Sequence, residues 1–370
     1  MMDDIMGIAR NLLYLTLAGL TIASCGHSSK KYSDKEVLGK LIFNDTTLSE
    51  PVGQSCATCH DRSTGFSDER HRAVSQGAVS GLYSQRNSMG ICYVKYVPGL
   101  HYDDSDSTYV GGLFWDGRSP SLQHQAGIPL LNPVEMGNTD KRMVVEKVKR
   151  AAYYPQLVDI YGDSDNVDSI FAYITDAMAV YESSDEISPF TSKFDAYIKG
   201  KCQLTAQEKR GMDLFQDKGQ CANCHIMEPD ERAHRVLFTD FTYDNLGIPV
   251  NPDNPHYNVP ARYFLLTTDS LDLGLGSIVK VESENGKFRV PTLRNIELTA
   301  PYGHNGYFKT LEDIVHFYNV RDAGNEFPQA EYPATVNREE LGNLELTVDE
   351  EEDIVAFMKT LTDGFMEMCE

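Results

Sequence analysis

Two five-residue stretches carry the residue types that attach haem covalently. Each has the order Cys-x-x-Cys-His, and they comprise Cys56, Cys59 and His60 and then Cys221, Cys224 and His225. The two thiols of such a motif add across the vinyl groups of one haem, and the following histidine becomes the proximal ligand of the iron. A zinc site would want four closing ligands, and a thioredoxin-type pair would want a strand–helix–strand context that is absent here. The motifs therefore predict two covalently bound haems c.

The N-terminus predicts export. An apolar run from Leu12 to Ala23 follows Arg10 and is too short to span a bilayer comfortably. The run ends in Ile22-Ala23-Ser24-Cys25, which resembles a bacterial lipoprotein box whose cysteine receives the lipid. We expect a lipoprotein signal peptide over residues 1–24, a tether over 25–32 and a periplasmic protein anchored to the membrane. An ordinary cleaved signal with an unmodified Cys25 is the alternative.

Composition limits the partners. The chain has 370 residues and a formal net charge of −22, which argues against nucleic acid and against an anionic membrane surface as a partner. The same charge permits a basic or dipolar electron-donor protein. Cys92, Cys202 and Cys369 lie outside the haem motifs and the lipoprotein box, and an exported compartment allows one disulfide among them.

The elements that must position the haem motifs are helices. Capping boxes begin at Ser33, Thr205 and Thr347, and amphipathic helices are expected over residues 141–153 and 167–182. The pattern Gly-x-x-apolar-Phe occurs at Gly39–Phe43 and again at Gly211–Phe215, in each case ahead of a haem motif. This repeat indicates a duplicated cytochrome c unit, in which the first and last helices pack across each other. The fold class is therefore mainly α, with tandem haem domains at residues 33–195 and 200–370; a small hairpin is expected around residues 277–290.

Taken in order, these motifs resemble the bacterial di-haem cytochrome c peroxidase family, which includes the di-haem enzyme of methylamine utilisation. Besides the haem motifs, the resemblance rests on Arg86-Asn87, Phe114–Arg118, Gln125-Ala126, Pro133–Met136, Ser188–Phe190, Pro291–Asn295 and Leu298–Gly306. It implies a peroxidatic N-terminal haem and a C-terminal haem that accepts electrons from a small donor such as a monohaem cytochrome. It also implies a homodimer.

The resemblance assigns roles to single residues. Trp115, the only tryptophan of the chain, falls at the inter-haem position, although a lone tryptophan is more often a core residue. Gln125 and Glu135 fall in the distal pocket, where a carboxylate can move a proton between peroxide oxygens. An N-cap or a surface ion pair is the alternative role for Glu135. The family's calcium would take the side chain of Asn87 and the carbonyls of Thr299 and Pro301.

Three positions depart from the peroxidase pattern. Val79 stands where activation-dependent members carry a distal histidine, and Met89 replaces a proline. Tyr318 stands fourteen residues after His304, where the second haem usually finds a methionine. We therefore expect an open first haem and Tyr318 as the sixth ligand of the second. The other histidines that could reach an iron are His71, His101, His124, His234, His256 and His316.

These residues predict reduction of hydrogen peroxide by a di-haem enzyme. Oxidation of a partner protein or a small substrate is the alternative within chemistry, as Tyr318 suggests. A di-haem electron carrier without peroxide chemistry is the alternative of another class. Gln125 and Glu135 argue against the carrier, because electron transfer alone needs no distal carboxylate.

Overall fold

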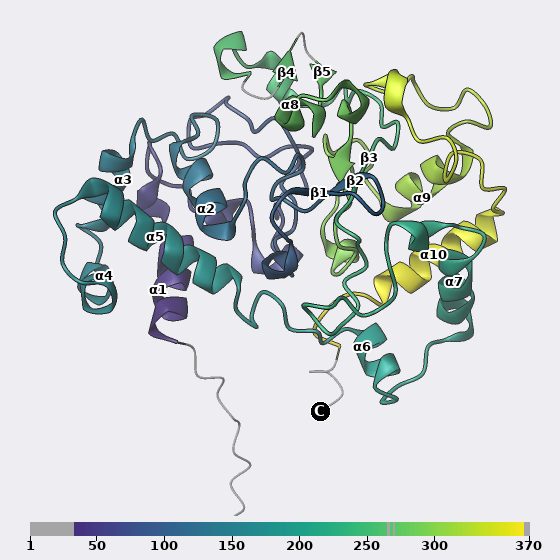
Figure 1. Ribbon diagram of the computed structural model, residues 1–370, viewed down its shortest axis with the longest axis horizontal. Coiled ribbons are helices and arrows are strands. Elements are labelled where there is room, and N and C mark those ends of the chain that lie inside the picture. The colour runs from purple at the N-terminus through teal and green to yellow at the C-terminus, as the bar shows by residue number, and fades with distance from the viewer. Residues whose placement is uncertain (1–32, 265–266, 269–270, 366–370) are drawn as a thin grey trace, which may run out of the picture. The chain divides into compact units, whose positions relative to one another are not determined.

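Short helices are the main regular structure in the computed structural model, which describes residues 33–264, 267–268 and 271–365 (Figure 1). The described helices are α1 (Asp34–Phe43), α2 (Leu122–Leu131), α3 (Lys141–Val148), α4 (Tyr154–Tyr161), α5 (Val167–Glu182), α6 (Lys193–Ile198), α7 (Ala206–Gln216), α8 (Gly276–Val279), α9 (Leu311–Val320) and α10 (Val348–Lys359). The described strands form three antiparallel pairs: β1 (His101–Asp103) with β2 (Thr108–Val110), β3 (Tyr243–Asp244) with β6 (Phe288–Arg289), and β4 (Thr267–Thr268) with β5 (Leu271–Asp272). The mainly α class is confirmed. The predicted signal peptide and tether lie outside the described residues.

The capping boxes begin helices where the sequence places them. Ser33, Thr205 and Thr347 cap α1, α7 and α10, and each accepts a hydrogen bond from the backbone of a glutamate three residues on. That glutamate returns a bond to the cap residue, so two otherwise unpaired backbone donors are satisfied at each start.

Two helix pairs explain the repeated glycine. In Figure 1, α1 crosses α5 and α10 lies against α7, and both pairs are in contact. Gly39 packs on the backbone carbonyl of Ala177, and Gly211 packs on that of Asp353; a Cβ at either glycine would overlap the carbonyl. Four residues later, Phe43 and Phe215 are buried. The repeat therefore encodes a close crossing followed by an aromatic anchor.

The helix pairs have separate cores that meet in a third cluster. Leu38, Ile42 and their neighbours form a core within residues 38–178, and Phe215, Phe357 and their neighbours form one within residues 194–361. The third cluster joins Phe43, Phe66 and Tyr93 to Leu237 and Phe241. This shared packing explains why the chain from Ser33 onward forms one compact unit.

Two local predictions need correction. The hairpin expected at 277–290 is wrong: that stretch contains α8, and β6 pairs with the distant β3. The helix expected over 141–153 ends at Val148. A proline also lies inside one helix, because α2 continues through Pro129 to Leu131. Pro129 is tolerated because it stands in the last turn, where its missing N–H removes a single bond.

No helix in the described part of the chain is long and apolar enough to cross a membrane.

The glycine crossing yields a stability prediction. Gly211→Ala should lower the free energy of unfolding by about 1–3 kcal/mol, because the new methyl group overpacks α7 against α10. Gly324→Ala is the matched control, since no atom lies within 4 Å of the Cβ that it would add. Thermal unfolding followed by circular dichroism compares the two variants, and equal midpoints would contradict the packing role of Gly211.

Candidate active site

Each haem motif is a tight turn that aims its histidine. The motif cysteines begin 3-10 turns at Cys56–Thr58 and Cys221–Asn223, and the histidine backbone bonds back to the first cysteine in both. The Nδ1 atom of His60 lies 3.0 Å from the Phe66 carbonyl oxygen, and that of His225 lies 2.9 Å from the Phe238 oxygen. A carbonyl can only accept, so Nδ1 carries the proton and Nε2 keeps the lone pair that iron needs.

Burial keeps these rings in the form that binds iron. It lowers the pKa of His225 to about 4 and lowers the pKa of His60 as well. Burial also raises the pKa of Cys221 to about 12 and that of Cys59 to about 12, so the free thiols are neutral.

A buried carboxyl with one unpartnered oxygen lies near the first motif. The Oε2 atom of Glu135 is buried and has no hydrogen-bond partner among the described residues. Burial raises the pKa of this carboxyl, although the charge of Arg118 opposes the shift. Glu135 in turn contributes to the raised pKa of Cys56 and Cys59, so its carboxylate lies within electrostatic reach of both motif cysteines. Gln125 lies half-buried on α2.

A buried ion network fixes the loop that carries Trp115. Arg86 pairs with Asp116 at 2.7 Å and with Asp272 at 2.6 Å, and all three side chains are nearly inaccessible to solvent. Arg118 also pairs with Asp116 and stacks over the Phe114 ring, 3.6 Å from its centroid. The segment Phe114–Arg118 is therefore held by the ion pairs of Asp116 with Arg86 and Arg118 and by the stacking of Arg118 on Phe114.

Trp115 lies on a cavity that it shares with the second haem motif. The walls include Cys221, Cys224, His225 and Tyr318 together with Trp115, Asn87, Thr299 and Pro301. The indole Nε1 donates to the Asn87 carbonyl at 2.9 Å. The structure thus brings the predicted inter-haem tryptophan, the predicted sixth ligand and the predicted calcium ligands to one cavity.

The same cavity has polar groups that suit the carboxylates of a haem. Arg289 is only 5% exposed, yet its guanidinium reaches no carboxylate among the described residues. Its Nε atom donates a hydrogen bond to the Phe114 carbonyl, and its Nη2 atom lies 3.9 Å from the Met89 sulfur. His304 bonds Glu331 through Nε2, and its buried Nδ1 has no partner in the described part. A buried cation without a counter-ion is costly, so a bound carboxylate would stabilise it. The residues present therefore fit a haem at this motif.

Tyr318 lies within reach of the second motif. Burial raises its pKa, and the nearby Cys221 and Cys224 raise it further. His316, two residues earlier on α9, holds Glu351 through Nδ1 and Glu326 through Nε2, so neither nitrogen is free for iron.

The other candidate histidines are occupied differently. His71, His124 and His256 bond Ala300, Ser119 and Tyr83 through Nδ1, and His101 bonds the carbonyl of Gly99 in its own loop. His234 has a left-handed backbone, with a φ of 51°. Val79 is 38% exposed, which fits its lack of a ligand role.

Two further sets of predicted residues can be placed. The Asn87 amide nitrogen donates to the Ala73 carbonyl at 3.1 Å, which leaves its oxygen available for a cation. No disulfide joins Cys92 to Cys202, and Cys369 lies outside the described residues.

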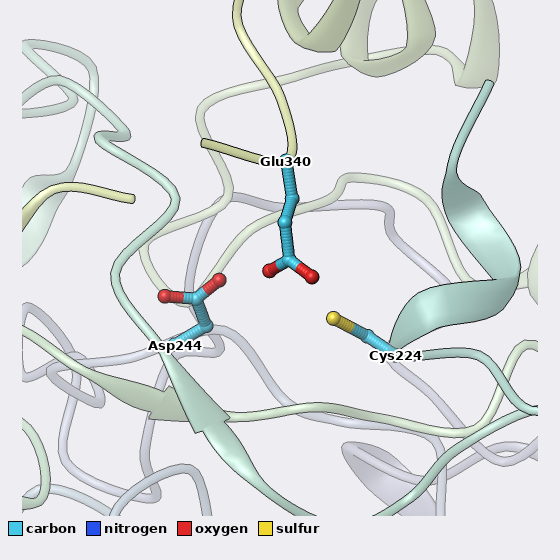
Figure 2. A group of neighbouring side chains, drawn as sticks. All are labelled: Cys224, Asp244 and Glu340. Carbon is cyan, nitrogen blue, oxygen red and sulfur yellow. The ribbon is translucent and has the colours of Figure 1, made fainter. Parts of the chain in front are cut away.

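One acidic cluster at the second motif resembles a metal site. Figure 2 shows the carboxylate of Glu340 extending into the space between Asp244 and the sulfur of Cys224. Asn337 donates to both carboxylates, at 2.7 and 2.8 Å, so a shared amide already holds them together. A thioether at Cys224 would carry no thiolate charge, so haem attachment and a metal ion compete for this sulfur.

Comparison with known proteins identifies the family. The family model described as di-haem cytochrome c peroxidase matches residues 33–203. The methylamine utilization protein MauG of Paracoccus denitrificans is 35% identical over 347 residues, covering 88% of each chain. Cytochrome c551 peroxidase of Nitrosomonas europaea is 30% identical over 339 residues, covering 89% of this chain and 80% of its own. The chain belongs to the di-haem cytochrome c peroxidase family.

A solved structure agrees with this assignment. The di-haem peroxidase BthA of Burkholderia thailandensis superimposes with a TM-score of 0.80 at 32% identity, covering 90% of this chain and 87% of the other. The family match and this fold support two haems c, one at each Cys-x-x-Cys-His motif.

Sequence reasoning missed several residues of the site. Arg289 and His304 received no role, because only the structure shows that, among the described residues, Arg289 reaches no carboxylate and Nδ1 of His304 has no partner. Glu182, at the end of α5, is a second buried carboxyl beside Cys56; burial raises its pKa to about 8. Its only sequence signal is a charged residue at the end of an apolar helix.

The position of Tyr318 yields a spectroscopic prediction. Tyr318→Phe should convert the second haem from six-coordinate to five-coordinate and high-spin, because the phenol oxygen is lost. Tyr302→Phe is the matched control, since Tyr302 lines the same cavity but its hydroxyl donates to the Ile296 carbonyl at 2.8 Å. Optical and paramagnetic resonance spectra of the oxidised proteins decide between them. A low-spin second haem that survives Tyr318→Phe would contradict the assignment.

Proposed function

We propose that this protein reduces hydrogen peroxide to water with electrons from a small donor such as a monohaem cytochrome. The observation that carries the proposal is the buried carboxyl of Glu135 beside the first haem motif, whose Oε2 atom has no hydrogen-bond partner among the described residues. The haems, when bound, supply peroxide binding at the first motif and electron storage at both. The reaction consumes two electrons and two protons for each peroxide and releases two waters.

Glu135 is the proton shuttle in this scheme. Its pKa is raised by burial, so the carboxyl can hold a proton as well as accept one. It takes the proton from one peroxide oxygen and returns it to the other, and that second oxygen leaves as water. Gln125 orients the peroxide by hydrogen bonding from α2. Arg118 stands within electrostatic reach of Glu135 and favours its ionised form during the transfer.

Trp115 is the relay between the two sites. Its carbonyl accepts from the Arg289 N–H at 2.8 Å, while its indole donates to Asn87, so both ends of the residue are fixed. A fixed indole between two redox centres can be oxidised transiently without reorganisation. Phe114–Arg118 would then act as one unit in electron transfer.

The wider organisation follows the same proposal. The N-terminal haem domain spans residues 33–195 and the C-terminal one residues 200–370. A calcium ion between them takes Asn87, Thr299 and Pro301. Lipidation at Cys25 anchors the protein in the periplasm, and it forms a homodimer.

A second function is favoured by Tyr318. An anionic oxygen ligand stabilises ferric iron, so it makes the second site a poor acceptor from high-potential donors and a better store of oxidising equivalents. That property suits oxidation of a partner protein or a small substrate. The 35% identity to a methylamine utilization protein supports this alternative.

Glu135→Gln tests the proton shuttle. We expect the rate of peroxide reduction to fall by about a hundredfold or more, because the amide cannot accept and return a proton. Both haem spectra should stay unchanged, since the shape of the side chain is retained. Glu69→Gln, an exposed carboxylate in the same half, is the control and should keep the full rate. A variant with undiminished peroxide reduction would contradict the role of Glu135.

A further inference from the structure

A second cavity, outside the haem sites, has the size and chemistry of a small-molecule site. Its volume is about 540 Å³, within the range of ligand pockets, about 300–1,000 Å³. Its walls come from distant parts of the chain and include His71, Arg72, Tyr83, Asp253, Tyr307 and Lys309. Pockets of this kind are common where separately packed halves of a protein meet.

The cavity is positive in a strongly negative protein. Arg72 and Lys309 oppose a single carboxylate, that of Asp253, whereas the whole chain has a net charge of −22. The partner of Arg72 is the neutral amide oxygen of Gln76, at 3.4 Å. Lys309 lies 3.8 Å from Asp253, but both side chains are more than 70% exposed, so that pair is weak. An anionic group would therefore find an uncompensated guanidinium here.

Hydrogen bonds hold the walls in place. Asn251 donates to the carbonyls of Asn305 and Gly306, at 2.9 and 3.0 Å. His71 donates from Nδ1 to the Ala300 carbonyl at 2.9 Å, so its Nε2 keeps a lone pair. That lone pair is the acceptor that a phenol O–H requires, and the rings of Tyr83 and Tyr307 offer flat apolar surfaces. A preformed site of this kind loses little entropy on binding.

Two hydrogen bonds connect the cavity to Trp115. Ala73, which lines it, accepts from the side chain of Asn87 at 3.1 Å, and the Asn87 carbonyl accepts from the Trp115 indole at 2.9 Å. Pro301 lines both this cavity and the one that holds Trp115. A molecule bound against Ala73 would thus be connected to the proposed relay through Ala73 and Asn87.

We propose that this cavity binds an anionic phenolic reductant, a hydroquinone that carries a carboxylate, and delivers its electrons to Trp115. The inference rests on the proposed peroxidase function, because peroxide is the oxidant. The hydroquinone loses two electrons and two protons and becomes a quinone. Peroxide gains two electrons and two protons and becomes two waters. Arg72 binds the carboxylate, and His71 accepts a phenol proton.

Steady-state oxidation of gentisate by peroxide tests the proposal in the di-haem protein. Arg72→Gln should raise the KM for gentisate about tenfold, the loss of one charge-assisted hydrogen bond, and leave kcat unchanged. The KM for neutral hydroquinone should not change. Arg70→Gln is the matched control, because Arg70 lies two residues away, is exposed and does not line the cavity. Equal gentisate KM values in both variants and the parent protein would overturn the proposal.

A binding measurement separates this inference from the proposed function. Isothermal titration of the oxidised protein with salicylate, which has the carboxylate and phenol but is a poor reductant, should show one site that Arg72→Gln weakens. Absence of salicylate binding, with normal peroxide reduction by a reduced cytochrome, would overturn the proposed binding site in this cavity. The proposed peroxidase function would still hold. Salicylate binding without peroxide turnover from any donor would contradict the peroxidase instead.

Discussion

Everything at the two redox sites depends on one hydrogen bond in each, from the motif histidine to a phenylalanine carbonyl. Both acceptors, Phe66 and Phe238, have left-handed backbones, with φ values of 58° and 55°. Such a conformation is uncommon for a bulky residue and persists only where the surroundings enforce it. Burial of both phenylalanines in the cores supplies that enforcement. The carbonyl of each phenylalanine is held in place by its backbone conformation and orients the imidazole. The imidazole in turn determines the position of the iron.

The two halves are coupled by buried charge as well as by apolar packing. Arg86, from the first half, pairs with Asp272 from the second, and Asp116 completes the network under the Trp115 loop. Removing one partner of such a network leaves an uncompensated buried charge, a loss of about 3–5 kcal/mol. Rigidity of this kind suits a relay residue, because a fixed indole needs no rearrangement between turnovers.

Local signals in the sequence were sufficient for part of this account. The spacing of Cys56 to His60 specifies haem attachment, and the box at Ser33 specifies a helix start, since each interaction spans only a few residues. The repeated glycine was visible, but its purpose depends on a partner helix more than a hundred residues away. For the same reason the β3–β6 pairing was mistaken for a local hairpin, and the lone charge of Arg289 had no signal at all. The role of Tyr318 stays a prediction from the family resemblance; the structure shows only that Tyr318, on α9, lines the same cavity as the second haem motif.

Paramagnetic resonance of the fully oxidised protein tests the central claim most directly, combined with addition of peroxide before any reduction. If Val79 leaves the first haem open and Tyr318 closes the second, the spectrum should contain a high-spin signal. The protein should then react with peroxide at once. Two low-spin signals with no high-spin signal, and no reaction until one electron has been added, would contradict the account.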